Sequence, residues 1–227
     1  MNTLIKVIVA LVLSIFLTSC NFYGGGVMGN GNIITQERAV TATFKSVKAT
    51  EGVDVYISQS ATASIKIEAD DNIIDLIETE VNNGELVIST KENIGRASKK
   101  VYVSLSEIER LATTSGADLE SMGTLKVDNL DLDASSGSDL VVEVQATAIS
   151  ADASSGADIE VFGVSTSLNA DASSGSDIKA ERLNVETVSA DASSGANIKI
   201  GAVKTINYHK SSGGGVSYKG TPEVVEN

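Results

Sequence analysis

The sequence has one cysteine, one histidine and no tryptophan, and these scarcities exclude several kinds of site. A single cysteine cannot form a disulfide within the chain, so a disulfide-stabilised scaffold is excluded. Structural zinc sites use about four Cys or His ligands, which this chain does not supply. A Ser-His-Asp hydrolase would depend entirely on His209, which we interpret as a surface histidine.

Basic residues are also few. The 227 residues contain 17 Lys and Arg against 30 Asp and Glu, which gives a formal charge of −13. Nucleic-acid binding needs a cationic surface that displaces counterions, so we predict that nucleic acid is not a partner. Hydrophobic residues make up 42% of the chain, which is enough for one folded domain with a short appendage.

The first twenty residues have the pattern of a bacterial lipoprotein signal peptide. Lys6 precedes an apolar run over residues 7–17 that is too short for a transmembrane helix of about twenty residues. The run ends in Leu-Thr-Ser-Cys, where an aliphatic and two small residues precede the cysteine, as in a lipobox. We predict that residues 1–19 are a signal peptide and that Cys20 is lipidated. The alternative is a plain secretory signal that leaves Cys20 as a free thiol.

Lipidation of Cys20 would anchor the protein to a membrane, because each buried methylene of an acyl chain contributes about 0.8 kcal/mol. The following residues are rich in Gly and uncharged, so we assign residues 20–32 to the lipidated cysteine and a flexible tether. We expect a location in the bacterial cell envelope, at the outer membrane. The sequence leaves both the periplasmic and the surface-facing side open.

An octamer, Asp-Ala-Ser-Ser-Gly-(Ala/Ser)-(Asp/Asn)-(Ile/Leu), recurs at spacings of 19, 19 and 20 residues. Its copies occupy residues 133–140, 152–159, 171–178 and 191–198. Inward and outward residues alternate within each copy, which is the period of a β-strand. A coil of this length at about 3.3 Å per residue traces roughly 65 Å, the perimeter of a parallel β-helix coil. We predict an all-β solenoid with 19–20 residues per coil and about six coils.

The segment before these repeats, residues 33–110, is less regular but also alternates, so we predict larger, irregular coils at the N-terminal end. An Asn-Gly pair at residues 83–84 indicates a turn between two alternating runs. We expect the wider interior there to be filled by three aromatic residues: Phe44, Tyr56 and Tyr102.

Several motifs in order resemble the head GIN domain of putative auto-transporter adhesins. Gly31–Arg38 and Gly52–Tyr56 resemble the opening of that domain, and Gly213–Pro222 resembles its ending. The resemblance covers nearly the whole mature chain and implies a right-handed parallel β-helix, often carried by a bacterial lipoprotein. It implies no agreed activity. We assign residues 33–222 to the β-helical domain and residues 223–227 to a C-terminal tail.

Stacked coils would align the repeated aspartates in two outward columns, with about 4.8 Å between neighbouring coils. Carboxylates at about 5 Å repel each other by roughly 0.8 kcal/mol in water, and Ca²⁺ would remove this cost with oxygen ligands. Seven aspartates are therefore calcium candidates: Asp133, Asp152, Asp171, Asp191, Asp139, Asp158 and Asp177. We favour a solvated acidic face, partly balanced by Lys179 and Lys199, with no cofactor.

The second serine of each octamer shares the numerical parity of the inward residues. We therefore expect an inward structural ladder of hydroxyl groups, made by Ser136, Ser155, Ser174 and Ser194. No base is repeated beside these serines, so they are not expected to act as nucleophiles. The glycine after each serine is expected at a turn position with positive φ.

These features predict a membrane-anchored, non-enzymatic β-helical lipoprotein that acts as an adhesin or surface-binding module. Its expected partners are the membrane, through Cys20, and a cell-surface protein or glycan. Two alternatives are a structural or stress-related envelope spacer without a specific ligand and a calcium-stabilised solenoid. A β-helix enzyme that degrades acidic polysaccharide is disfavoured, because the chain has only four Arg and an acidic surface.

Overall fold

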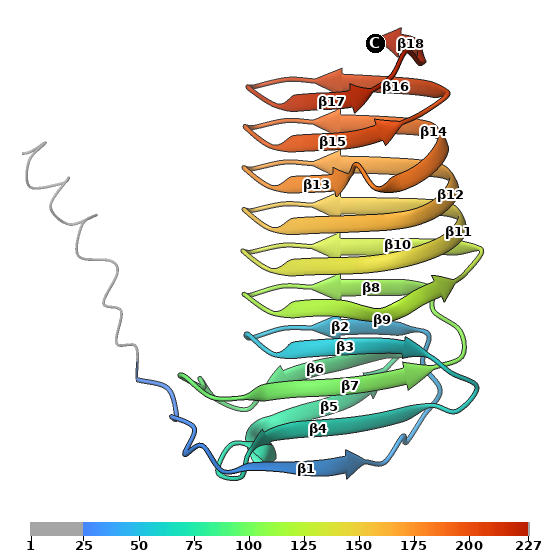
Figure 1. Cartoon of the computed structure of the whole chain (residues 1–227). Helices are drawn as coiled ribbons and strands as arrows, with labels where there is room; N and C mark the ends of the chain where they lie inside the picture. The colour runs from blue at the N-terminus through green and yellow to red at the C-terminus, as the bar shows by residue number, and fades with distance from the viewer. Residues whose placement is uncertain (1–24, 227) are drawn as a thin grey trace, which may run out of the picture.

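The computed structural model describes residues 25–226, which form a single β-solenoid of 18 strands and one short 3-10 helix (Figure 1). The predicted signal peptide, Cys20 and the first part of the tether lie outside these residues. Within the described part, no helix has the length and apolar character needed to cross a membrane.

The regular part of the solenoid has two opposite faces of parallel strands. The β10 face contains β8 (Arg110–Thr113), β10 (Asn129–Ala134), β14 (Leu183–Ala192), β16 (Thr205–Lys210) and the C-terminal halves of β11 (Asp139–Ala153) and β12 (Asp158–Ala172). The β9 face contains the N-terminal halves of β11 and β12 with β9 (Asp118–Lys126), β13 (Asp177–Ala180), β15 (Asn197–Ala202) and β17 (Gly215–Lys219). The predicted all-β parallel solenoid is confirmed.

Figure 1 shows the strands of the β9 face in front, pointing right, and those of the β10 face behind, pointing left. The chain rises from one coil to the next along this path, so the solenoid is right-handed, as the usual crossover between parallel strands is.

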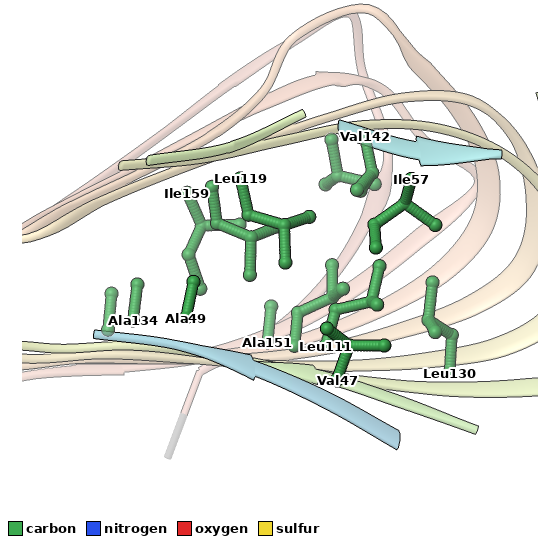
Figure 2. Close-up of a cluster of buried hydrophobic side chains, with 14 of the residues drawn as sticks. Val47, Ala49, Ile57, Leu111, Leu119, Leu130, Ala134, Val142, Ala151 and Ile159 are labelled. Atoms are coloured by element: carbon green, nitrogen blue, oxygen red, sulfur yellow. The ribbon is translucent and has the colours of Figure 1, made fainter. Parts of the chain in front are cut away.

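The core is a narrow channel filled by aliphatic side chains from both faces. Figure 2 shows Val47, Leu111 and Leu130 on one side, opposite Ile57 and Leu119 on the other. Each of these side chains is at most 1% exposed. Complete burial stabilises the fold by about 1.5–3 kcal/mol for a residue of this size. The small cross-section explains why the repeats use Ala, Ile and Val and almost no aromatic residues.

The N-terminal end is irregular, as predicted, and the order of its coils departs from their order in the chain. The coil of β2 (Ser46–Ala49) and β3 (Asp54–Gln59) is inserted between two coils that come later in the chain. On one side it pairs with β6 (Glu85–Thr90) and β7 (Lys99–Leu105), and on the other side with β8 and β9.

Antiparallel strands close the base beneath these coils. β4 (Ser64–Asp70) pairs with both β7 and β1 (Ile33–Arg38), and β5 (Ile77–Asn82) forms a hairpin with β6. The predicted turn is present, with positive φ at both Asn83 and Gly84, as a two-residue hairpin turn requires. The 3-10 helix (Ile74–Leu76) adds buried Ile74 to the base.

Two of the three expected interior aromatic residues lie elsewhere. Phe44 is 7% exposed and joins the core, but Tyr56 and Tyr102 lie on the outer surface. Their rings stack at 5.1 Å between centroids. The prediction was wrong because both tyrosines alternate with buried neighbours, such as Val55 and Ile57 on β3, and therefore point outward.

The tether prediction also needs correction, because the chain is docked on the body from Gly26 onward. The Val27 N–H donates to the Asn93 carbonyl at 3.0 Å, and the Gly29 N–H donates to the Arg96 carbonyl at 3.0 Å. A side chain at Gly26 or Gly29 would overlap neighbouring atoms. Gly26 therefore allows close approach to the backbone of residues 93–95, and Gly29 allows close packing against the Asp70 carboxylate, so neither glycine serves flexibility.

The far end is closed by Tyr208 and Tyr218, whose rings lie 6.0 Å apart and pack against the core. The predicted C-terminal tail is in fact the last strand, β18 (Glu223–Glu226), which pairs in parallel with β16. The tail assignment was therefore wrong from residue 223 to residue 226, because the backbone there continues the hydrogen-bonded stack.

Candidate functional site

The strand registers place the repeated aspartates in the two predicted columns. The first column lies on the β10 face and consists of Asp133, Asp152, Asp171 and Asp191. The second column lies on the β9 face and consists of Asp118, Asp139, Asp158, Asp177 and then Asn197. The seven calcium candidates are thus divided between opposite faces of the molecule and do not form one site.

A groove of about 400 Å³ follows the first column across several coils. Its walls include the four aspartates of that column and a parallel row of hydroxyl side chains: Thr114, Ser135, Ser154, Ser173 and Ser193. Lys48 and Arg110 lie at the end nearest the base of the solenoid. The groove therefore offers a repeating set of hydrogen-bond acceptors and hydroxyl groups.

Polar side chains continue beside the groove on the same face. A second depression of about 490 Å³ is lined by apolar residues such as Leu168 and by polar side chains that include Ser150, Asn169, Ser189 and Asn207. Together, these four residues and the groove make the β10 face a broad surface of Asp, Ser, Thr and Asn. We call the set of these side chains on the β10 face the polar face.

Carboxylates in the groove repel one another. The pKa of Asp152 is raised above its ordinary value, first because the carboxyl group is partly removed from water and then because Asp171 and Asp133 are negatively charged. The pKa of Asp118 on the other face is raised for the same reasons, with Asp139 and Asp54 as the negative neighbours. Both columns therefore disfavour additional negative charge.

One arginine compensates the charge at the base end of the groove. The Arg110 Nε donates to Asp133 Oδ2 at 2.7 Å, and its Nη1 donates to Glu85 Oε1 at 2.6 Å. Further along, Asn169 Nδ2 donates to Asp171 Oδ2 at 3.0 Å. These contacts orient the two carboxylates across the surface of the groove.

The second column has a lysine partner of its own. Lys179 Nζ donates to Asp158 Oδ2 at 2.6 Å, and this hydrogen bond raises the pKa of Lys179. Asn197 Nδ2 donates to Asp177 Oδ1 at 2.9 Å. The predicted balance by Lys179 is therefore present on the β9 face.

The expected inward serine ladder is wrong. Ser155 has φ 53° and Gly156 has φ 73°, and the Ala157 N–H donates to the Ser154 carbonyl at 3.2 Å. This is a two-residue turn with positive φ at both central positions, so the Ser155 side chain is exposed. The same conformation recurs at Ser136, Ser174 and Ser194. The prediction assumed that inward and outward residues alternate through the whole octamer, and this alternation ends where the turn interrupts the strand.

Successive turns also bond to one another. The Gly156 N–H donates to the Ser174 carbonyl at 3.1 Å, and the Gly137 N–H donates to the Ser155 carbonyl at 3.1 Å. The predicted need for positive φ at the glycines is confirmed, and the preceding serines adopt it too. The repeated Ser-Gly pair is thus explained by turn geometry rather than by chemistry of the second serine's hydroxyl group.

The role of the other serine was missed. The first serine of each octamer shares the outward parity of the aspartate and lines the groove, as Ser154 and Ser173 do. The alternation of the strand already indicated this position, because a residue two places after an aspartate points to the same side as that aspartate.

Within residues 25–226, no three Asp, Glu, His or Cys side chains converge in a way that could hold a metal ion. Each coil contributes one carboxylate to a column, whereas Ca²⁺ takes six to eight oxygen ligands. Calcium binding by the seven aspartates stays an untested alternative to the favoured solvated acidic face.

The chain is therefore a right-handed β-solenoid with a repeating polar face on one side. A family model described as "Putative auto-transporter adhesin, head GIN domain" matches residues 43–222. The chain belongs to this family, as the sequence motifs predicted. No curated protein sequence matches the chain.

Solved structures share the fold at low sequence identity. A putative adhesin from Bacteroides fragilis has a TM-score of 0.73 and 17% identity, with 89% of this chain and 100% of that chain covered. A putative lipid binding protein from Parabacteroides distasonis has a TM-score of 0.72 and 20% identity over 89% and 95% of the two chains. A putative adhesin from Parabacteroides merdae has a TM-score of 0.70 and 18% identity over 89% and 95%. At these identities the likeness establishes the fold.

Proposed function

We propose that this protein is a non-enzymatic, lipid-anchored binding module of the bacterial cell envelope that holds a hydroxyl-rich cell-surface glycan on its polar face. The observation that carries the proposal is the groove along the first aspartate column, in which the same carboxylate and hydroxyl groups recur from coil to coil. The family description as an adhesin agrees with a binding role.

Sugar hydroxyl groups both donate and accept hydrogen bonds, and the groove offers partners for both. Carboxylates such as Asp171 accept, while hydroxyls such as Ser173 donate and accept. The groups repeat at the spacing of neighbouring strands, about 4.8 Å, so a polymeric ligand can use several coils at once. Weak contacts that engage together give a much higher avidity than one contact alone.

The charge of the groove restricts the glycan. The pKa of Asp152 is raised first by partial removal from water and then by the neighbouring carboxylates, and an anionic polysaccharide would add to this repulsion. A neutral or amino-sugar polymer would not. The groove therefore favours neutral or cationic glycans over uronic acids.

A binding role accounts for the groove better than catalysis does. In a catalytic pair of carboxyl groups, different environments shift the two pKa values apart, so that one group acts as an acid and the other as a base. Here the carboxylates are copies of one another on successive coils, and the closing member of the column is His209 beside Asp191. Repetition of one group along a groove suits a repeating ligand.

The anchoring part of the proposal rests on the lipobox that ends at Cys20. Acyl chains at Cys20 would hold the module at the outer membrane, and the polar face would then meet glycans of the envelope or of neighbouring cells.

A glycan array and whole-cell binding assays with the full chain test the proposal. We expect binding to neutral or amino-sugar polymers and little binding to polymers of uronic acid. Uniformly negative results would contradict the proposal and favour a structural spacer.

A further inference from the structure

The described chain begins at the base of the solenoid. Figure 1 shows the N-terminal segment leaving beside β1, at the end opposite to β18. Asp70, which is 3% exposed, accepts hydrogen bonds from the backbone N–H groups of Gly31 and Ser98. Asn32 Nδ2 donates to Asp71 Oδ2 at 2.7 Å. These contacts fix the exit point of the segment on the base.

Little chain is left between that exit point and the proposed anchor. Four residues separate Cys20 from Gly25. Five Cα–Cα steps span at most roughly 18 Å when fully extended. If Cys20 is lipidated, as the proposed function states, the base of the solenoid lies at the membrane surface and cannot move far from it.

Exposed apolar side chains are concentrated at the same end. Seven large hydrophobic residues are exposed in the part of the chain that the structure describes, and four of them precede residue 41. They are Met28, Ile33, Ile34 and Val40, with exposures of 57%, 46%, 40% and 37%. We call these four side chains the apolar base. Apolar side chains at a membrane surface gain free energy by entering the boundary between headgroups and acyl chains.

The base also carries charged side chains, of which Asp75 and Glu80 are exposed and lie near Arg38 and Lys91. The buried Asp70 accepts hydrogen bonds from the Gly31 and Ser98 N–H groups, and Asp71 accepts one from Asn32. A bilayer of zwitterionic lipid does not repel these carboxylates, so charge leaves the contact possible. The aspartate columns lie on the two faces of the regular coils, away from β1. The side of the molecule nearest the anchor therefore holds most of the exposed large apolar side chains in the described part of the chain.

We propose that the apolar base rests on the lipid bilayer, so that the solenoid stands on the membrane with its coils stacked away from it. This inference rests on the proposed lipid anchor and adds a second membrane contact made by the protein itself. The polar face then runs outward from the membrane, with Arg110 at its membrane-proximal end.

Site-specific labelling of the lipidated full chain tests the inference. Cys20 is the only cysteine and its thiol is consumed by lipidation, so a new cysteine reacts alone with a fluorophore. Thr35→Cys places the label on β1, and Thr166→Cys places it on β12, at a threonine that is also exposed. Each protein is reconstituted into phosphatidylcholine vesicles that contain a lipid with a nitroxide quencher near the headgroup.

We expect the label at residue 35 to be quenched several-fold more than the label at residue 166. Equal quenching in protein that floats with the vesicles overturns this inference and leaves the anchor intact. Protein that does not float overturns the anchor, and the inference with it.

A lengthened tether separates true contact from mere proximity. Twelve Gly and Ser residues inserted after Tyr23 would let the body drift away from the membrane if acyl chains were the only attachment. We expect the label at residue 35 to stay quenched in this variant, because the apolar base still binds the bilayer. Loss of quenching overturns the membrane contact.

Discussion

Asp152 lies directly opposite Asp171 on the neighbouring strand, with an aspartate of the same column on its other side as well. Like charges in this position oppose each other, and the pKa of Asp152 is raised first by partial burial and then by this repulsion. A column of this kind lowers stability, so its repetition over four successive coils indicates a role other than stabilisation.

Asp152→Asn should raise the free energy of unfolding at pH 7. A carboxyl group whose pKa is raised on folding destabilises the folded state when it is ionised, and the amide removes that charge. We expect a gain of roughly 0.2–1 kcal/mol, the range of partly exposed charge interactions. The gain should shrink as pH falls through the raised pKa and vanish below the ordinary value of about 3.8, where the carboxyl group is protonated in both states.

Chemical denaturation between pH 3 and pH 8 measures this effect. A gain that stays constant across the range would show that the substitution acts through packing or hydrogen bonding rather than through charge.

Gly156→Ala should destabilise the turn although no atom lies near the added methyl group. The left-handed backbone at φ 73° costs an alanine roughly 1–2 kcal/mol relative to glycine. No atom lies within 4 Å of the added methyl group, so no contact changes this cost. Thermal unfolding of this variant should therefore show a moderate loss.

Gly163→Ala is the matched comparison, because its φ is also positive, at 112°, but its methyl group would overlap the Val144 carbonyl. We expect a clearly larger loss than for Gly156→Ala. Equal losses would mean that close approach of the backbones at Gly163 is unimportant.

Calcium should stabilise the protein no more than magnesium does. One carboxylate per coil gives too few oxygen ligands for a Ca²⁺ site, so both ions are expected to raise the thermal midpoint equally by screening charge. Melting curves in EDTA, in millimolar Ca²⁺ and in millimolar Mg²⁺ provide the test. A rise specific to Ca²⁺ would establish the calcium-stabilised solenoid instead.

Cys20→Ser should move the protein from the membrane fraction to the soluble fraction of the cell, because no acyl chain can be attached. Ser19→Ala keeps a small residue before the cysteine and should leave the protein in the membrane. Persistent membrane association of Cys20→Ser would contradict the lipid anchor.

The regular half of the fold was predictable because each coil repeats one sequence at a spacing of 19–20 residues. That spacing alone aligned Asp152 with Asp171. The turn at Ser155 was not predictable by alternation, because a turn with two positive φ angles resets the direction of the side chain. The position of β2 between β6 and β8 has no local signal, since it depends on pairing between segments far apart in the chain.

The polar groove was only half visible in the sequence. The aspartates were predictable because they repeat, whereas the first serine of each octamer was not recognised as part of the groove. The docking of residues 26–32 was not predictable either. Gly29 packs closely against Asp70, although the composition of this stretch is typical of flexible linkers. Charge and spacing can be read from a sequence, whereas close packing between segments far apart in the chain requires the structure.

The central claim is that a glycan binds along the first aspartate column, and two matched substitutions test it most directly. Asp171 in the groove and Asp177 on the β9 face are both half-buried and both accept a hydrogen bond from an asparagine amide, at 3.0 Å and 2.9 Å. Affinity for the strongest glycan found on the array is measured by calorimetry for the full chain and for both Asp→Asn variants. We predict that Asp171→Asn weakens binding several-fold and that Asp177→Asn leaves it unchanged; equal affinities in the two variants would contradict the claim.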